Sequence, residues 1–297
     1  KVGDLFVIES TSPIGTTEMM TKLIFDERPE LEGNIYIAYC PERVLPGNVI
    51  YELVHNDRVI GGINPESTEK AIAFYSQFVQ GKLHRTNSRT AELCKLTENS
   101  SRDVQIAFAN ELSLICDKAG INVWELIELA NKHPRVDILQ PGCGVGGHCI
   151  AVDPYFITAD FPMESQIISK AREINNYKSF WCAEKVQNEM LKFELVHHRQ
   201  PIVAMMGLAF KPKTNDMRMA PAITIIEALL EKGARIRAYD PKAFDYAQGL
   251  WGDRIYYAKN SYDALEGADA MLLLTEWNEF RRPDFDKIKN LLKTPVI

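Results

Sequence analysis

Residues 202–241 of the chain read IVAMMGLAFKPKTNDMRMAPAITIIEALLEKGARIRAYDP. The apolar run at Ile202–Phe210 predicts a buried strand. A helix pattern follows over Pro221–Lys232, with proline at its favourable first position, and Gly233 ends it. A second strand is predicted over Ala234–Tyr239, where an Asp-Pro pair closes it. A strand, a helix and a strand in this order predict a parallel sheet with a crossover helix.

The first third of the chain shows the same alternation. Short apolar runs predict three strands, over Leu5–Glu9, Asn34–Tyr39 and Arg58–Gly61. A helix pattern through Phe25 follows the first strand, and Asn64 caps another helix that runs to about Val79. Ala270–Leu274 and Pro295–Ile297 are predicted strands near the other end. The predicted fold class is therefore α/β, with two Rossmann-like parallel-sheet domains.

The middle of the chain is predicted to be helical. Residues 89–119 contain no proline or glycine and carry helical spacing, and Gly120 ends the pattern. Val123–Asn131 and Ser165–Leu195 are further helices, and the polar segment Val196–Pro201 is a linker. We therefore divide the chain into residues 1–87, 88–196 and 197–297. A long helix between two α/β blocks often acts as a spacer and a dimer contact.

Gly142, Gly144 and Gly147 match the pattern G-x-G-x-x-G. A dinucleotide fingerprint must follow a strand and open a helix. The preceding segment, His133–Pro141, is polar and contains two prolines, and the residues after the glycines are not a suitable helix start. We reject the fingerprint and expect these glycines to let the backbone approach a ligand closely. Both chain ends also fall within predicted strands, so we expect a complete fold to extend beyond them.

Composition excludes several classes of protein. The 297 residues are 46% hydrophobic and 25% charged, as in an ordinary soluble protein, and the net charge of −6 argues against a general nucleic-acid binder. No apolar stretch is long enough to cross a membrane, and no secretory signal opens the chain. Six cysteines without CxxC pairs indicate free thiols of a cytoplasmic protein. Six histidines without ligand spacing predict no metal site.

Three short patterns suggest chemistry. In PGCGVGGHCIAVDP, Cys149 follows paired glycines and precedes Asp153 by four residues, which suits a nucleophile on a constrained loop. Alone, such a cysteine is more often a small buried hydrophobe. Lys95 and Asn99 share one helix face and could donate hydrogen bonds to an oxyanion, although a solvated helix face is the commoner outcome.

The third pattern is the segment CPER, whose Glu42 follows a strand at the end where α/β proteins place ligands. The alternative is that this segment only forms an ordinary loop after the strand. His148 leaves two alternatives open, because it could tune the neighbouring thiolate or only hydrogen-bond the backbone.

Together these patterns resemble the UDP-glucose/UDP-N-acetylmannosamine dehydrogenase family, and the resemblance covers essentially the whole chain. The matching segments are ESTSPIGTTE (9–18), YCPERVLPG (39–47), AELCKLTENS (91–100), HPRVDILQPGCGVGGHCIAVDPYF (133–156) and GLAFKPKTNDMR (207–218). GVGGHCIAVDP and the ESTSP opening are most similar to the UDP-N-acetyl-D-mannosamine 6-dehydrogenase branch. Pro46 and Val152 replace a glutamate and a lysine of the UDP-glucose branch, which suits that assignment.

The resemblance implies an NAD-dependent oxidation of the C6 alcohol of a UDP-N-acetylhexosamine to the uronic acid. Cys149 would form a thiohemiacetal and then a thioester, and two NAD would be consumed per sugar. UDP-N-acetyl-D-mannosamine is the expected substrate, with UDP-N-acetylglucosamine as the alternative. A second alternative is a non-catalytic UDP-sugar-binding dimeric core, because the family's Gly-rich cofactor loop lies outside this chain.

The resemblance also implies roles for single residues. Lys95 and Asn99 would stabilise the oxyanion, Asp153 would act as a base or orienting group, and Glu42 would activate water. Arg135 would reach the substrate of a neighbouring subunit, which implies a homodimer or a higher homo-oligomer. Thr11 would be a further catalytic residue, near the cofactor and a catalytic water. Further expected contacts are, for the substrate, Arg43, Val44, Leu45, Gly144, Phe210 and Lys211, and for NAD, Ser10, Thr11 and Arg218. The three domains would be the C-terminal part of an NAD-binding domain, a dimerisation domain and a UDP-sugar-binding domain.

Overall fold

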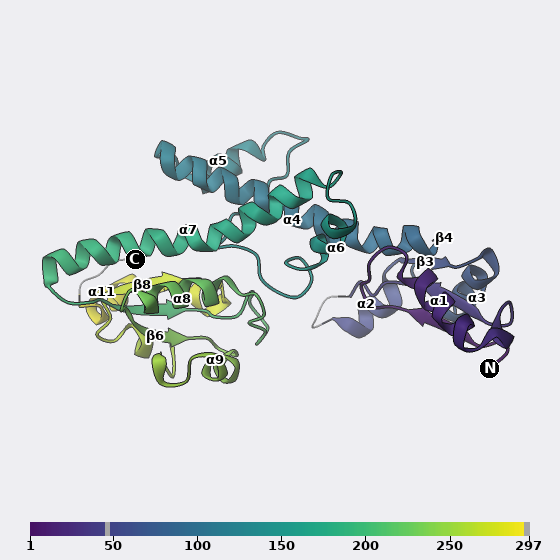
Figure 1. Cartoon of the computed structure of the whole chain (residues 1–297). Helices are drawn as coiled ribbons and strands as arrows, with labels where there is room; N and C mark the ends of the chain where they lie inside the picture. Colours follow the sequence, from purple (N-terminus) through teal and green to yellow (C-terminus); the bar gives the residue numbers. More distant parts are fainter. Residues whose placement is uncertain (45–47, 294–297) are drawn as a thin grey trace. The chain divides into compact units, whose positions relative to one another are not determined.

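The computed structural model describes residues 1–44 and 48–293. The chain divides into two compact units, and each is described by itself. The first unit holds residues 1–101 and 153–165, and the second holds residues 102–152 and 166–297. Figure 1 shows the elements of both units and the two helices of 32 residues each, α4 (Ser88–Ala119) and α7 (Gln166–His197).

The first unit is built on one four-stranded sheet. Its elements are β1 (Leu5–Ile8), α1 (Thr16–Glu27), a 3-10 turn (Pro29–Leu31), β2 (Tyr36–Tyr39), α2 (Val49–His55), β3 (Arg58–Gly62), α3 (Pro65–Tyr75), β4 (Leu83–Asn87), the start of α4 and α6 (Asp153–Asp160). The strand order is β1-β2-β3-β4. The outer pairs are parallel as predicted, whereas β2 and β3 run antiparallel, so this sheet is mixed.

Alternating side chains along β2 explain how helices cover both faces of this sheet. Ile37 belongs to a cluster that includes Ile24 and Phe25 of α1. Ala38 points the other way, into a cluster that includes Ala71 and Tyr75 of α3. A strand buried on both faces needs apolar residues at successive positions, which is the continuous pattern seen in this segment.

The second unit contains the remaining elements. They are the rest of α4, α5 (Val123–Ala130), α7, β5 (Ile202–Met206), α8 (Pro221–Glu231), β6 (Arg235–Tyr239), α9 (Phe244–Trp251), a 3-10 turn (Gly252–Arg254), β7 (Tyr256–Tyr257), α10 (Ser261–Leu265), β8 (Ala270–Leu273), a 3-10 turn (Asn278–Phe280) and α11 (Phe285–Leu291). The strand order is β7-β6-β5-β8, and every pair is parallel. This is the sheet predicted from residues 202–241.

Alternate side chains of β5 show how helices cover the two faces of the second sheet. Val203 and Met205 of β5 pack in the cluster that contains Ile225 of α8 and Met190 of α7. Ala204 and Met206 face the opposite cluster, which is built with α10 and α11. The α/β fold class is thereby confirmed, with helices on both faces of a parallel sheet.

Helix ends follow the predicted signals closely. The Asn64 side chain accepts a hydrogen bond from Ser67 N at 2.8 Å and caps α3. Gly233 has a φ of +83°, a left-handed conformation that favours glycine and ends α8. Other ends differ: α3 stops at Tyr75 and not at Val79, and α7 extends to His197 into the predicted linker.

The remaining expectations have mixed outcomes. No strand precedes the glycines of residues 142–147, so the fingerprint context is absent as predicted, although α6 does begin at Asp153. The predicted strand Pro295–Ile297 lies outside the described residues. All six cysteines are free thiols. In the described part of the chain, no helix has the length and apolarity of a bilayer-crossing segment.

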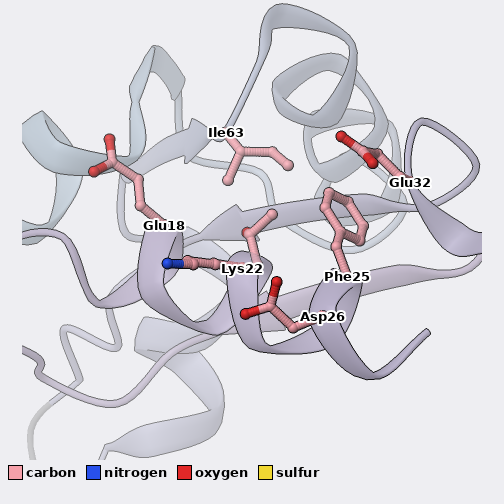
Figure 2. Close-up of a pocket in the computed structure, with 7 residues that line it drawn as sticks. Glu18, Lys22, Phe25, Asp26, Glu32 and Ile63 are labelled. Carbon is pink, nitrogen blue, oxygen red and sulfur yellow. The ribbon is translucent and has the colours of Figure 1, made fainter. Parts of the chain in front are cut away.

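A hollow of about 390 Å³ lies beside α1 in the first unit (Figure 2). Its lining residues are Glu18, Thr21, Lys22, Phe25, Asp26, Glu32 and Ile63. Three carboxylates face one ammonium group there, which disfavours a nucleotide phosphate. None of the residues predicted to bind substrate or cofactor lines this hollow, so the candidate site lies elsewhere.

Candidate active site

Cys149 lies half-buried on an irregular loop of the second unit. Three glycines bring this loop against the rest of the unit. A Cβ on Gly144, whose φ is +134°, would lie 2.4 Å from Ser179 Oγ, and a Cβ on Gly147 would lie 2.9 Å from the ring of Phe210. A Cβ on Gly146 would meet a backbone oxygen at 2.7 Å. Protein atoms fill the space that a Cβ would occupy at Gly144 and Gly147, so the missing side chains let this loop pack closely within its own unit. The expected approach of this loop to a ligand stays a prediction.

The loop that follows β5 runs beside the cysteine loop. Gly147 N donates to Arg218 O at 2.8 Å, and Phe210 N donates to Asp216 O at 3.1 Å. The Lys211 ammonium lies 5.3 Å from the centre of the Phe210 ring. The structure thus brings Phe210, Lys211 and Arg218 together next to Gly147 and the residues that follow it.

His148 pairs with side chains of that neighbouring loop. Its Nδ1 lies 2.8 Å from Arg218 Nη2 and 3.4 Å from Asp216 Oδ2. Neither alternative considered for His148 named this pairing, which joins the cysteine loop to residues 216–218. The hydrogen bond to Asp216 is the main cause that raises the pKa of Arg218.

Asp216 titrates far from its usual range. The Arg218 guanidinium donates to it at 2.7 Å and, despite burial, lowers the pKa of the carboxyl from 3.8 to about 2. Because the folded-state pKa is depressed, the stabilisation is complete above about pH 4 and is lost as pH falls through about 2. The shift corresponds to at most about 2 kcal/mol, which the exposed Arg218 partner reduces to about 1 kcal/mol.

We therefore expect Asp216→Asn to lower the free energy of unfolding by about 1 kcal/mol near pH 6, with the difference vanishing toward about pH 2. Urea titrations of both proteins at several pH values measure it. Arg218→Met serves as the matched change, because it removes the cation and should abolish the same pH dependence. A difference that stays constant across this range would show that charge is not the cause.

In the first unit, Lys95 and Asn99 lie on one face of α4, as their spacing predicts. Asn99 Nδ2 donates to Asp153 Oδ2 at 2.5 Å, and Asp153, at the start of α6, is 3% exposed. Lys95 is half-buried, and its ammonium has no hydrogen-bond or ion-pair partner among the described residues. A cation without a partner beside an amide fixed by a buried carboxylate is suited to receive an anionic oxygen.

The segment Glu42–Val44 is tied to the same helix. Glu42 N donates to Glu9 O at 3.1 Å, and the Glu42 carboxylate accepts from Val44 N. Arg43 forms an ion pair with Glu98 of α4, with Nη2 2.7 Å from Oε1. Sequence reasoning missed Glu98, because nothing in its spacing marks a partner 55 residues away. Leu45, also predicted to contact substrate, lies outside the described residues.

Glu92 is a second residue that sequence reasoning missed. Its buried carboxylate accepts from Gly15 N at 2.6 Å, from Thr17 N at 2.8 Å and from Thr17 Oγ1 at 2.7 Å. It therefore satisfies the free amides at the start of α1, where a negative charge is also favoured by the helix dipole. The N-terminus of α1 is thus filled by the protein's own side chain.

We expect Glu92→Ala to lower the free energy of unfolding by about 3 kcal/mol, because several buried donors lose their acceptor. Urea unfolding followed by circular dichroism measures the loss. Glu18→Ala is the matched control: Glu18 is on α1, is exposed and pairs with Arg89 at 2.9 Å, so its removal should cost less than about 1 kcal/mol. Equal losses in both variants would contradict the capping role.

The predicted site residues thus fall into two groups, one on each unit. The first unit carries Ser10, Thr11, Glu42, Arg43, Val44, Lys95, Asn99 and Asp153, and the second carries Arg135, Gly144, Cys149, Phe210, Lys211 and Arg218. Arg135 is exposed, and its side chain has no partner in residues 1–44 and 48–293. The same described residues contain no group of three or more His, Cys, Asp or Glu arranged to hold a metal ion.

Three domain profiles of one family match the chain. They describe the UDP-glucose/GDP-mannose dehydrogenase family NAD binding domain over residues 1–79, its central domain over 89–177 and its UDP binding domain over 204–297. The chain belongs to the UDP-glucose/GDP-mannose dehydrogenase family. This confirms the family predicted from the sequence motifs, the enzyme class and NAD as the cofactor.

Individual members of the UDP-glucose/GDP-mannose dehydrogenase family agree with this assignment. An NDP-N-acetyl-D-galactosaminuronic acid dehydrogenase of Ralstonia nicotianae is 45% identical over 98% of this chain and 69% of its own length. A UDP-N-acetyl-D-mannosamine dehydrogenase of Campylobacter jejuni is 48% identical over 97% of this chain and 72% of its own length. Both are named as dehydrogenases of a nucleotide-linked, N-acetylated sugar.

Solved structures from the family share the fold. The UDP-D-ManNAc dehydrogenase of Pyrococcus horikoshii superposes with a TM-score of 0.85 at 38% identity, over 98% of this chain and 67% of the other. The UDP-N-acetyl-mannosamine dehydrogenase of S. aureus gives 0.82 at 37% identity, over 99% and 67%. The Rossmann-type architecture predicted for this family member is therefore confirmed.

The residues of the first unit fit the cofactor of this dehydrogenase family. Ser10 is exposed beyond the carboxyl end of β1, and the Thr11 hydroxyl has no hydrogen-bond partner among the described residues. Dinucleotides bind over this edge in α/β sheets. Because Glu92 fills the N-terminus of α1, that helix is not the place for the pyrophosphate.

Proposed function

We propose that this chain oxidises the C6 alcohol of UDP-N-acetyl-D-mannosamine to the carboxylate, using NAD and a covalent adduct on Cys149. The observation that carries the proposal is the pair on α4. Lys95 has no partner among the described residues, while Asn99 is held by the buried Asp153. Such donors are needed where negative charge develops on a carbonyl oxygen.

The roles of the chain's own groups follow from this arrangement. NAD, when bound, supplies a hydride acceptor for each of the two oxidation stages. Once the alcohol has become an aldehyde, the Cys149 thiolate attacks its carbon, and the carbonyl oxygen takes a proton to give a thiohemiacetal. Lys95 and Asn99 donate to that oxygen as its charge grows.

The second stage leaves a thioester on Cys149, which water must cleave. Water adds to the thioester carbon, and the carbon–sulfur bond breaks to return the thiolate and the uronic acid. Glu42, exposed on the first unit, is proposed to accept the proton from that water, and Asp153 to orient Asn99. Thr11 and Ser10 would hold the water and the cofactor near this step.

The second unit is proposed to bind the substrate through its UDP group. The UDP binding domain profile covers residues 204–297, which include Phe210 and Lys211. The Phe210 ring offers a stacking surface and Lys211 a cation for a phosphate. The other proposed substrate contacts are Gly144 of the second unit and Arg43 and Val44 of the first. Part of the Arg43 guanidinium is already paired with Glu98.

A second candidate substrate is UDP-N-acetylgalactosamine, the sugar with the galacto configuration. The Ralstonia relative, named for N-acetyl-D-galactosaminuronic acid, is 45% identical to this chain, close to the 48% of the Campylobacter mannosamine enzyme. The manno and galacto sugars differ at C2 and C4, and each differs from the gluco sugar at one of these centres, which a few hydrogen bonds distinguish. UDP-N-acetylglucosamine remains the other alternative, as the motifs alone indicated.

The same proposal extends to organisation and location. We propose a homodimer or higher homo-oligomer in which Arg135 reaches a neighbouring subunit, since its exposed side chain has no partner among the described residues. Residues 1–87, 88–196 and 197–297 would serve cofactor binding, dimerisation and UDP-sugar binding. The six free thiols support a cytoplasmic location.

The test is NADH formation by the full-length gene product with four sugars in parallel: UDP-N-acetylmannosamine, UDP-N-acetylglucosamine, UDP-N-acetylgalactosamine and UDP-glucose. We expect two NADH per UDP-N-acetylmannosamine consumed. Turnover of only another of these sugars would keep the mechanism and change the substrate. A folded protein that binds these nucleotides yet forms no NADH would overturn the enzymatic proposal and leave a binding core.

A further inference from the structure

A buried charged pair joins α4 to α7 in the second unit. Asp103 of α4 is 0% exposed, and Arg172 of α7 is 2% exposed. Arg172 Nη1 lies 2.6 Å from Asp103 Oδ1. Helix packing alone does not require such a pair, because apolar residues of similar volume stabilise a buried contact at least as well. The pair therefore calls for a role beyond packing.

Arg172 also reaches the loop that carries the nucleophile. Its Nη1 donates to Ile150 O at 3.3 Å, and Ile150 directly follows Cys149. Its Nη2 donates to Asn176 Oδ1 at 2.7 Å, which fixes the plane of the guanidinium. One arginine thus holds the downstream side of the Cys149 loop.

The upstream side of the loop is held through two asparagines. Asn175 Nδ2 donates to Asp103 Oδ1 at 2.8 Å and to Asp103 O at 3.0 Å. Asn110 Nδ2 then donates to Asn175 Oδ1 at 2.8 Å, and Gly142 N donates to Asn110 Oδ1 at 2.9 Å. Both asparagines are 0% exposed.

Each side-chain amide in this series of hydrogen bonds has only one orientation that suits both of its neighbours. Because the Asp103 carboxylate accepts, Asn175 must offer it the NH2 group and keep its oxygen for Asn110. Asn110 must then turn its own oxygen to the amide of Gly142. The charge on Asp103 therefore sets the direction of every hydrogen bond up to the cysteine loop.

We propose that Asp103 and Arg172 are positioning residues for Cys149, holding residues 142 and 150 so that the thiol between them is presented in one orientation. The inference rests on the proposed role of Cys149 as the nucleophile. Attack on a carbonyl requires a narrow range of distance and angle, and a displacement of about 1 Å reduces the rate about 100-fold. Glycines at 142, 144, 146 and 147 give this loop little stiffness of its own.

The main test is the double variant Asp103→Leu/Arg172→Met in the full-length gene product. It removes both buried charges together, so it leaves no unpaired ion and is expected to fold. We expect kcat to fall at least about tenfold, with KM for the UDP-sugar within about threefold of wild type. Site-resolved mass spectrometry of iodoacetamide-treated protein should show an altered pH profile for alkylation of Cys149.

The matched control is Asp117→Leu/Lys185→Met. This pair, 2.6 Å apart, also joins α4 to α7, but it is partly exposed and makes no contact with the cysteine loop. We expect its kcat to stay within about twofold of wild type. Wild-type kcat together with a wild-type alkylation profile in the folded Asp103→Leu/Arg172→Met protein would overturn the proposal.

If that double variant does not fold, Asn110→Ala decides, because it keeps the Asp103–Arg172 pair and removes only the two hydrogen bonds that link Gly142 N to Asn175. A lower kcat at constant KM then supports positioning, and an unchanged kcat contradicts it. The alkylation profile needs neither NAD nor substrate. Absence of turnover in the wild type would therefore refute the proposed function, while the profile still tests the positioning of Cys149.

Discussion

Cys149→Ala is expected to abolish formation of the uronic acid. Without the thiol no thiohemiacetal or thioester forms, so the second oxidation stage has no covalent intermediate to act on. Loss of a nucleophile commonly lowers kcat by roughly 1,000-fold or more. At most the first stage remains, and it would release the aldehyde. The measurement is NADH per sugar consumed, with a hydroxylamine reagent present to capture any aldehyde.

Cys143→Ala is the control for this change. Cys143 lies on the same loop, and its thiol is hydrogen-bonded to Cys182 and packs against the core beside β5. Removing it tests whether any thiol of the loop suffices. Full activity in Cys143→Ala and none in Cys149→Ala supports the assignment. Two NADH per sugar from Cys149→Ala would rule out covalent catalysis at this residue.

Lys95→Met is the second large change. It retains the apolar stem of the side chain and removes the ammonium, which has no partner among the described residues. We expect kcat to fall roughly 100- to 1,000-fold, because the donor acts on charge that appears only in the transition state. KM for the UDP-sugar should change little. Steady-state NADH formation with the preferred substrate gives both constants.

Lys170→Met is the matched control, since Lys170 is an exposed lysine on a long helix, α7, and pairs with Glu173 three residues further along that helix. Its kcat should equal that of wild type. A Lys95→Met protein with normal kcat and a raised KM would instead show that Lys95 binds substrate and transition state equally. A normal kcat with a normal KM would remove Lys95 from the site.

Local patterns predicted most of the fold. The strands β1, β2, β3, β5, β6 and β8 were expected because apolar residues buried on two faces leave a continuous run. β4 (Leu83–Asn87) escaped prediction, since LHRTN lacks both alternation and apolar continuity and is a strand only through pairing with β3. The antiparallel pairing of β2 with β3 was not predicted either, because a local pattern does not show in which direction a strand enters the sheet.

The site was predicted unevenly for a related reason. Helical spacing correctly placed Lys95 and Asn99 on one face of α4. Their supporting contacts join residues far apart in the chain: Glu92 caps α1 across 77 residues, and Arg172 meets Asp103 across 69. No local periodicity encodes such pairs. A glutamate or arginine within an apolar helical face was the only available signal, and several partners fit it equally well.

Helix α4 carries Lys95, Asn99, Asp103 and Asn110 without a break. At about 100° per residue these four positions fall within one narrow sector of the helix surface. Inserting or deleting a single residue between positions 95 and 110 would turn the groups on one side of the change by about 100° relative to the others. This helix should therefore keep its length during evolution, even where surrounding loops gain and lose residues freely.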